Sequence, residues 1–152
     1  MLTQPTSDAL NVEAIQSRLR TQSIGKIIHV LVKTPSTNLV GLSLADSGEP
    51  HGTVILAEHQ TAGKGRLDRS WISPPNKNIY CSVILKKPGL QEHLSWVPLV
   101  TGLAIAEAIQ MNHSTLLSLK WPNDLLVGDK KLGGILCQGT IRKGDASALV
   151  VG

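Results

Sequence analysis

Three runs of apolar, largely β-branched residues lie in the first half of the chain, separated by residues that favour turns. They span residues 26–33 (KIIHVLVK), 53–60 (TVILAEHQ) and 79–86 (IYCSVILK). Short runs of this kind, bounded by turn residues, are typical of β-strands. The same reasoning predicts further strands in the second half of the chain, at 117–121, 131–141 and 146–151.

Three other segments carry apolar residues at the spacing of a helix. Residues 11–20 form the first, and Asn11 is a residue type that caps helix N-termini. The second spans 37–46, with Ser36 in position to cap it. The third and longest spans 95–111, and because few of its positions are polar, we expect this helix to be mostly buried.

Strands therefore outnumber helices, and two or three of them follow one another directly. This order predicts an α+β fold, a mixed β-sheet with helices packed on one face. No repeat, low-complexity tract or linker divides the chain, so residues 1–152 are predicted to form a single domain, with 1–25 as an N-terminal helical extension. Because chain termini usually lie solvated at the surface, the apolar ending ALVVG predicts a domain that is incomplete at its C-terminus.

Composition narrows the possible partners. The chain has 152 residues, 41% of them hydrophobic, which is enough to build a core. Its 15 Lys and Arg against 11 Asp and Glu leave a net charge of +4, and only 3% of residues are aromatic. A nucleic-acid partner is not expected, because that would require denser positive charge or aromatic platforms for bases. The longest uncharged apolar stretch, 94–106, is shorter than the roughly 20 residues of a membrane span, so no membrane association is expected.

The cysteines and the N-terminus predict a cytoplasmic protein. The first residues lack the basic-then-apolar pattern of a signal peptide. Cys81 and Cys137 lie inside apolar runs, and two cysteines in a chain of this size do not make a disulfide framework. A reducing compartment therefore fits better than secretion.

Several familiar catalytic patterns are missing. The five His residues show no short HxxxH spacing and the cysteines no CxxC spacing, so no protein-held metal site is expected. Ser43 lacks the second Gly of a nucleophile elbow. Residues 63–68 begin like a dinucleotide fingerprint, but Asp68 stands where the third Gly belongs. The chain thus offers no enzyme nucleophile of a known pattern.

Residues 57–71 (AEHQTAGKGRLDRSW) form the most informative segment. It follows a predicted strand and places two Gly and three cations, Lys64, Arg66 and Arg69, within seven residues. Glycines let backbone N–H groups turn toward a ligand, and cations share the charge of phosphate oxygens. The segment is therefore a candidate loop that orders over an anion; its alternative is a solvated surface loop between strands.

Two further segments carry candidate chemistry. In 120–124 (KWPND), which is followed by KKLGG at 130–134, Lys120 ends an apolar strand, where an amine is costly to bury unless it meets an anion. The alternative is a hairpin in which Asp124 caps its own turn and Lys120 lies at a solvated edge. At 34–38 (TPSTN), adjacent hydroxyl and amide side chains either cap the following helix or bind a small polar head group.

These three segments, in this order, resemble the catalytic domain of biotin–protein ligases over residues 26–152. Five motifs carry the resemblance: PSTN at 35–38, AEHQTAGKGR at 57–66, Trp71, KWPND at 120–124 and KLGGIL at 131–136. The resemblance implies the α+β fold that these ligases share with class II aminoacyl-tRNA synthetases. Because no DNA-binding domain precedes residue 26, the repressor activity of some relatives is not expected.

The resemblance also implies a reaction in two steps. Biotin and ATP, with Mg²⁺, form biotinyl-AMP and pyrophosphate, and a lysine of a biotin carboxyl carrier protein then attacks the adenylate. No enzyme nucleophile is needed, and charge stabilisation and positioning carry the catalysis. Family members often pair as homodimers. Two alternatives stay open: a lipoate ligase or octanoyltransferase relative, and a truncated, non-catalytic module that binds biotin or the carrier.

The resemblance assigns roles residue by residue. Lys120 matches the lysine that meets the biotin carboxylate and the α-phosphate, and the other catalytic candidates are Arg66, Asp124 and Lys131. The biotin or biotinyl-AMP contacts are Ser36, Thr37, Asn38, Gln60, Gly63, Lys64, Gly65, Arg66, Trp71 and Lys120. Lys64 stands where the family usually has Arg, and Asp68 where it has Gly, so we expect weaker retention of the adenylate.

Overall fold

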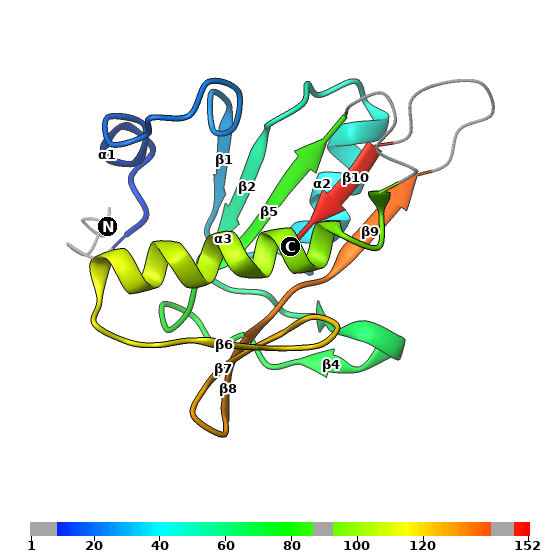
Figure 1. Cartoon of the computed structure of the whole chain (residues 1–152). Helices are drawn as coiled ribbons and strands as arrows, with labels where there is room; N and C mark the ends of the chain where they lie inside the picture. The colour runs from blue at the N-terminus through cyan, green and yellow to red at the C-terminus, as the bar shows by residue number, and fades with distance from the viewer. Residues whose placement is uncertain (1–8, 87–92, 141–147) are drawn as a thin grey trace, which may run out of the picture.

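The computed structural model describes residues 9–86, 93–140 and 148–152 (Figure 1). Parts of two predicted strands, residue 141 and residues 146–147, lie outside the described residues. The main sheet has five strands in the order β1 (Ile28–Leu31), β2 (Val54–Ala57), β5 (Tyr80–Leu85), β10 (Ala148–Val151), β9 (Cys137–Thr140). β1 and β2 run parallel and the other neighbours antiparallel, so the predicted α+β class with a mixed sheet is confirmed.

Helix α2 (Thr37–Asp46) has the predicted bounds and covers one face of the main sheet. It approaches closely because Gly41 has no side chain: a Cβ there would lie 2.8 Å from a methyl carbon of Val150. The hydrophobic cluster on this face is aliphatic: Ala45 of α2 packs with Ile55, Ile84, Ala148 and Val150 of the sheet. Ser36 occupies the N-cap position without a capping side-chain hydrogen bond.

The opposite face of the sheet is covered as well. Leu149 and Val151 alternate with the α2-facing residues of β10 and pack with Ile135, and Val97 and Ile105 of α3 (Val97–Asn112) pack against this cluster. Helices therefore lie on both faces of the sheet, which adds a layer to the single helical face that the sequence predicted (Figure 1).

Helix α3 is not the mostly buried helix that its composition predicted. Among its residues only Gly102 is buried, and Val100 and Leu103 are 62% and 53% exposed. The reason is that burial requires a facing layer, and α3 meets β6, β7 and the sheet along one side. Among the described residues, no helix has the length and apolar character needed to cross a membrane.

Two small sheets flank the main one. Residues 63–71 form a short hairpin, called the flap below, which consists of β3 (Gly63–Lys64), the 3-10 turn η1 (Arg66–Asp68) and β4 (Ser70–Trp71). The second small sheet contains β6 (Ser118–Lys120), β7 (Asp124–Val127) and β8 (Lys130–Gly134). A cis Trp121–Pro122 bond lies between β6 and β7.

The strand predicted at 131–141 is two strands in two sheets. β8 ends at Gly134, and from Cys137 the chain pairs with β10 in the main sheet. Leu136 exchanges backbone hydrogen bonds with Gly152 at the junction, 2.7 and 3.0 Å long. At the N-terminus, α1 (Val12–Gln16) is shorter than predicted, but Asn11 caps it through a 2.8 Å hydrogen bond from the Ala14 amide.

Candidate active site

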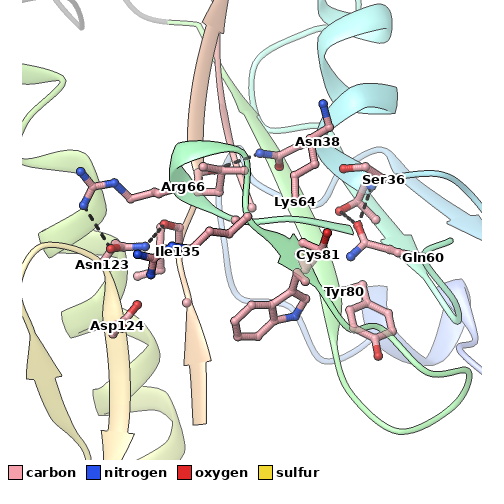
Figure 2. Close-up of a pocket in the computed structure, with 18 of the residues that line it drawn as sticks. Ser36, Asn38, Gln60, Lys64, Arg66, Tyr80, Cys81, Asn123, Asp124 and Ile135 are labelled. Carbon is pink, nitrogen blue, oxygen red and sulfur yellow. Dashed lines mark hydrogen bonds between the residues drawn. The ribbon is translucent and has the colours of Figure 1, made fainter. Parts of the chain in front are cut away.

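A cavity of about 370 Å³ opens between the N-terminus of α2, the flap and strands β7 and β8 (Figure 2). We call it the main cavity. Segments that lie far apart in the sequence form its walls, because the ends of β1 and β2 deliver residues 36–38 and 60 to the same edge of the sheet. The flap faces them and β7–β8 completes the enclosure.

One end of the main cavity is lined by buried, uncharged polar groups. Ser36, Thr37 and Asn38 are 3%, 4% and 4% exposed at the start of α2. Gln60 Oε1 accepts hydrogen bonds from the Thr37 amide (2.8 Å) and the Thr37 hydroxyl (3.1 Å). Gln60 therefore satisfies the helix N-terminus that Ser36 was predicted to cap, and within the described chain the Ser36 hydroxyl has no side-chain or backbone partner. It is available to a ligand in the cavity. We call this part the head-group end.

Ser82 of β5 lies directly behind the head-group end and is fully buried. Its hydroxyl lies 2.8 Å from Thr37 Oγ1 and 2.7 Å from Asn38 Oδ1. The Asn38 amide donates to the Leu136 carbonyl (3.0 Å) and to Gln138 Oε1 (2.9 Å). These contacts fix the orientation of the Asn38 side-chain amide, because both its nitrogen and its oxygen have hydrogen-bond partners. Sequence analysis missed Ser82 and Gln138; a lone Ser in the apolar run 79–86 was the available signal.

The same hydrogen-bond network reaches the base of the flap. Gln60 Nε2 donates to Ser73 Oγ at 3.1 Å, and the Ser73 hydroxyl donates to the Trp71 carbonyl at 3.2 Å. Gly63 has to be a glycine here, since a Cβ would lie 2.6 Å from the Trp71 carbonyl oxygen. The head-group end and the flap base therefore form one connected structure.

The flap adds cations to the lining of the main cavity. Lys64, Arg66 and Arg69 line it, together with Lys131 from β8. Arg66 Nη1 donates to Asn123 Oδ1 at 3.3 Å, and Lys131 Nζ lies 5.1 Å from the centre of the Trp71 ring. Both contacts connect the flap to the segment that carries KWPND and KLGG, and Figure 2 shows the bond between Arg66 and Asn123.

Lys131 forms an ion pair with Asp124, with Nζ and Oδ1 2.7 Å apart. Both residues line the main cavity. Asn123 Nδ2 donates to the Ile135 carbonyl at 3.0 Å, which holds this wall together. Asp124 is the first residue of β7 and lies opposite Lys120 in the β6–β7 hairpin, so the hairpin of the alternative interpretation is present.

Lys120 lies outside the main cavity. It is exposed at the end of β6, opposite Asp124 in the strand register. The structure therefore places Lys120 at the solvated edge that the alternative interpretation gave it, and its role as the catalytic lysine stays a prediction. Among the described residues, β6 pairs with β7 alone and is an edge strand, which leaves the Lys120 side chain exposed.

Of the other predicted site residues, all but Gly63 line the main cavity. Gly63 lines a neighbouring open groove on the other side of the flap instead of the main cavity. The structure brings ten of the predicted residues together in the main cavity: Ser36, Thr37, Asn38, Gln60, Lys64, Gly65, Arg66, Trp71, Asp124 and Lys131.

Tyr80 and Cys81 line the main cavity and were not predicted as site residues. The Tyr80 hydroxyl donates to the Pro74 carbonyl at 2.8 Å, so its position is fixed. Burial raises the pKa of the Cys81 thiol to about 11. A thiol with that pKa stays protonated at neutral pH and is a poor nucleophile.

The charge distribution describes the ligand that this cavity suits. Uncharged donors and acceptors lie at the head-group end, and four cations and one carboxylate, Asp124, also line the cavity. Two of the cations, Arg66 and Lys131, contact Asn123 and Asp124 at the start of β7, and we call that part the cationic end. Among the described residues, no three His, Cys, Asp or Glu side chains come together as a metal site. The cavity thus suits a molecule with a neutral polar head and an anionic remainder.

The sequence of this chain is similar to those of known ligases. The biotin/lipoate A/B protein ligase family matches residues 29–152. The biotin–[acetyl-CoA-carboxylase] ligase of Mycobacterium tuberculosis is 34% identical over 145 residues, covering 86% of this chain and 53% of the relative. The bifunctional ligase/repressor BirA of Bacillus subtilis is 28% identical over 143 residues, covering 94% of this chain and 44% of the relative. The chain spans about half the length of these relatives.

Solved structures show the same fold. The biotin protein ligase of Aquifex aeolicus in complex with biotin and ATP superposes with a TM-score of 0.68 at 33% identity, over 83% of this chain and 51% of that one. The Leishmania major enzyme in complex with biotinyl-5-AMP superposes with a TM-score of 0.66 at 26% identity, over 83% and 56%. The predicted biotin-ligase-like fold is confirmed.

Proposed function

Because the chain belongs to the biotin/lipoate A/B protein ligase family, we propose that it is a biotin–protein ligase. It forms biotinyl-AMP and pyrophosphate from biotin and ATP, and then transfers biotin to a lysine of a biotin carboxyl carrier protein. The observation that carries the proposal is the two-ended main cavity, in which an uncharged polar end faces a cationic end. The bicyclic urea of biotin suits the first end, and the carboxylate and phosphates suit the second.

In the first step, a biotin carboxylate oxygen attacks the α-phosphorus of ATP, and the bond from that phosphorus to the bridging oxygen of pyrophosphate breaks. Two anions must approach each other, so the main barrier is electrostatic repulsion. Lys131, Lys64 and Arg66 hold positive charge where these anions meet. Fixed charges of this kind lower a barrier because they need no rearrangement as the reaction proceeds.

In the second step, the nitrogen of a neutral lysine amine bonds to the acyl carbon of the adenylate. The bond from that carbon to the phosphate oxygen breaks, AMP leaves, and the nitrogen releases a proton. The protein contributes position and charge without a covalent intermediate. The neutral Cys81 thiol in the cavity is consistent with this mechanism.

Among the lysines, Lys131 is the better candidate for the central cation. It lines the main cavity and Asp124 holds its amine at 2.7 Å, whereas Lys120 is exposed outside the cavity. The ion pair holds Lys131 in place before substrate binds and can be exchanged for an anionic oxygen afterwards. We therefore propose Lys131 for the role that the sequence resemblance gave to Lys120.

Mg²⁺ belongs to the proposal as a companion of the ATP phosphates. Asp124 is the one carboxylate among the described residues that line the main cavity, and Mg²⁺ sites at phosphates commonly use one or two carboxylates. The ion would offset phosphate charge, and Asp124 would help to hold it. The carrier protein is the proposed macromolecular partner, and a homodimer in the cytoplasm stays a prediction.

The test is direct. The 152-residue chain is incubated with biotin, ATP, Mg²⁺ and an apo carrier domain, and biotinyl-AMP and biotinylated carrier are measured separately. The proposal expects both products. Turnover with lipoate in place of biotin would support the lipoate-ligase alternative. Biotin binding with neither product would support the non-catalytic module and contradict the proposal.

A further inference from the structure

A second, smaller cavity of about 260 Å³ lies between the flap and strand β9. We call it the side cavity. It shares the flap residues Lys64, Gly65, Arg66 and Leu67 with the main cavity, as well as Leu136 beside β9. The two cavities therefore meet along the same stretch of flap. The side cavity therefore lies against flap residues that also line the main cavity.

Asp68 and Gln138 are polar residues that border the side cavity and do not line the main one. Asp68 also borders the open groove that Gly63 lines. Gln138 is held in place, because its Oε1 accepts the 2.9 Å hydrogen bond from Asn38. Asp68 is exposed on the flap, at a positive φ of 56° that follows the equally left-handed Leu67. Within the described part of the chain, the Asp68 carboxylate forms no hydrogen bond or ion pair. One wall of the side cavity is thus fixed, and the other presents a carboxylate that no side chain or backbone group of the described residues binds.

We infer that the side cavity admits the lysine of the protein acceptor, and that Asp68 binds its ammonium group on the way in. The inference rests on the proposed function. The cations of the main cavity suit anions, and the same cations repel the positively charged lysine that must reach the acyl carbon. Asp68 borders the side cavity beside Lys64 and Arg66 and offsets part of that repulsion.

Asp68 acts before the bond-making step. It binds the ammonium form, the ammonium then loses its proton to water, and the neutral amine attacks the acyl carbon as described above. Asp68 forms no covalent bond and is not required for adenylate formation. Asp68 should therefore speed transfer to a positively charged nucleophile and have little effect on transfer to an uncharged one.

The experiment compares two nucleophiles in single-turnover transfer. Purified biotinyl-AMP is bound to excess protein, and transfer is timed either to the lysine of an apo carrier domain or to hydroxylamine, which is uncharged at neutral pH. The variants are Asp68→Asn and Asp68→Gly. Both residue types accept a positive φ, so both remove the charge without straining the turn.

We expect the ratio of the carrier rate to the hydroxylamine rate to fall about threefold to fivefold in both variants, as for an exposed charge contact. The difference from the parent protein should shrink as ionic strength rises. An unchanged ratio would overturn the inference. So would a fall in Asp68→Gly alone, which would assign the effect to the backbone.

ATP–pyrophosphate exchange, measured on the same samples, separates this inference from the proposed function. If the parent protein shows no ATP–pyrophosphate exchange, the proposed formation of biotinyl-AMP is contradicted. The transfer experiment starts from added biotinyl-AMP, so it still decides the role of Asp68.

Discussion

The two ends of the main cavity are built in different ways. At the head-group end, Thr37 and Asn38 are each 4% exposed and Ser82 is fully buried behind them, within one hydrogen-bond network. At the cationic end, the flap residue Leu67 is 82% exposed, and Arg66 reaches the opposite wall through a single 3.3 Å hydrogen bond. The first end is organised before a ligand arrives, whereas the second has few buried contacts to hold it closed. We infer from this difference that the head-group end recognises biotin and that the flap closes over the bound ligand.

The largest expected effect concerns the cationic end. Lys131→Ala should slow biotinyl-AMP formation on the order of 10²-fold, because it removes a positioned charge from the place where two anions meet. Lys120→Ala removes the same charge from an exposed position outside the cavity, and its effect should be far smaller. Rapid-quench measurement of biotinyl-AMP compares the two. The reverse order would return the central role to Lys120.

The next effect concerns the head-group end. Ser82→Ala leaves Thr37 and Asn38 without a shared hydroxyl in a buried site, which should cost about 1–3 kcal/mol of folding stability and weaken biotin binding several-fold. Urea denaturation and biotin titration measure both quantities. Ser43→Ala on the exposed side of α2 is the matched control and should change little. Unchanged biotin affinity in Ser82→Ala would show that the network does not organise this end.

A smaller effect is expected from loosening the flap. Arg66→Ala removes the hydrogen bond to Asn123 and one cation, so biotinyl-AMP should dissociate about tenfold faster, while biotin alone binds nearly as before. Dissociation of labelled intermediate, measured by filter binding, gives the rate. An equal loss of biotin affinity would contradict the division between the two ends, because it would mean that the flap also recognises the head group.

The smallest effect concerns the thiols of the sheet that supports the site. Burial raises the pKa of Cys81 and of Cys137 to about 11 from an ordinary value of 9.0. The unfolded chain therefore loses these protons first as pH rises, and stability should fall between about pH 9 and 11, by roughly 1 kcal/mol per thiol. Urea denaturation at pH 8 and pH 10 tests this, with Cys81→Ala as the comparison. Equal pH dependence in that variant would contradict a buried, neutral Cys81.

Local pattern was sufficient to predict much of the fold. Helix α2 has the predicted bounds, and strands β1, β2 and β5 lie inside the predicted runs. Most of the motif residues meet in one cavity, because each motif follows an element whose apolar pattern sets its position in the sheet. The exposure of α3 was not predictable in this way, since composition says which residues can be buried but not whether another layer faces them.

The sequence by itself determined the element types, the order of the motifs and the kind of chemistry, because helix and strand periodicity and side-chain charge are local properties. Only the tertiary structure decided that Lys131 and not Lys120 lines the cavity, that Ser82 supports Asn38, and that the strand predicted at 131–141 divides between two sheets. Each of these depends on pairing between residues far apart in the chain. In a strand, a shift of one residue moves a side chain to the opposite face, and the pairing partner sets that register.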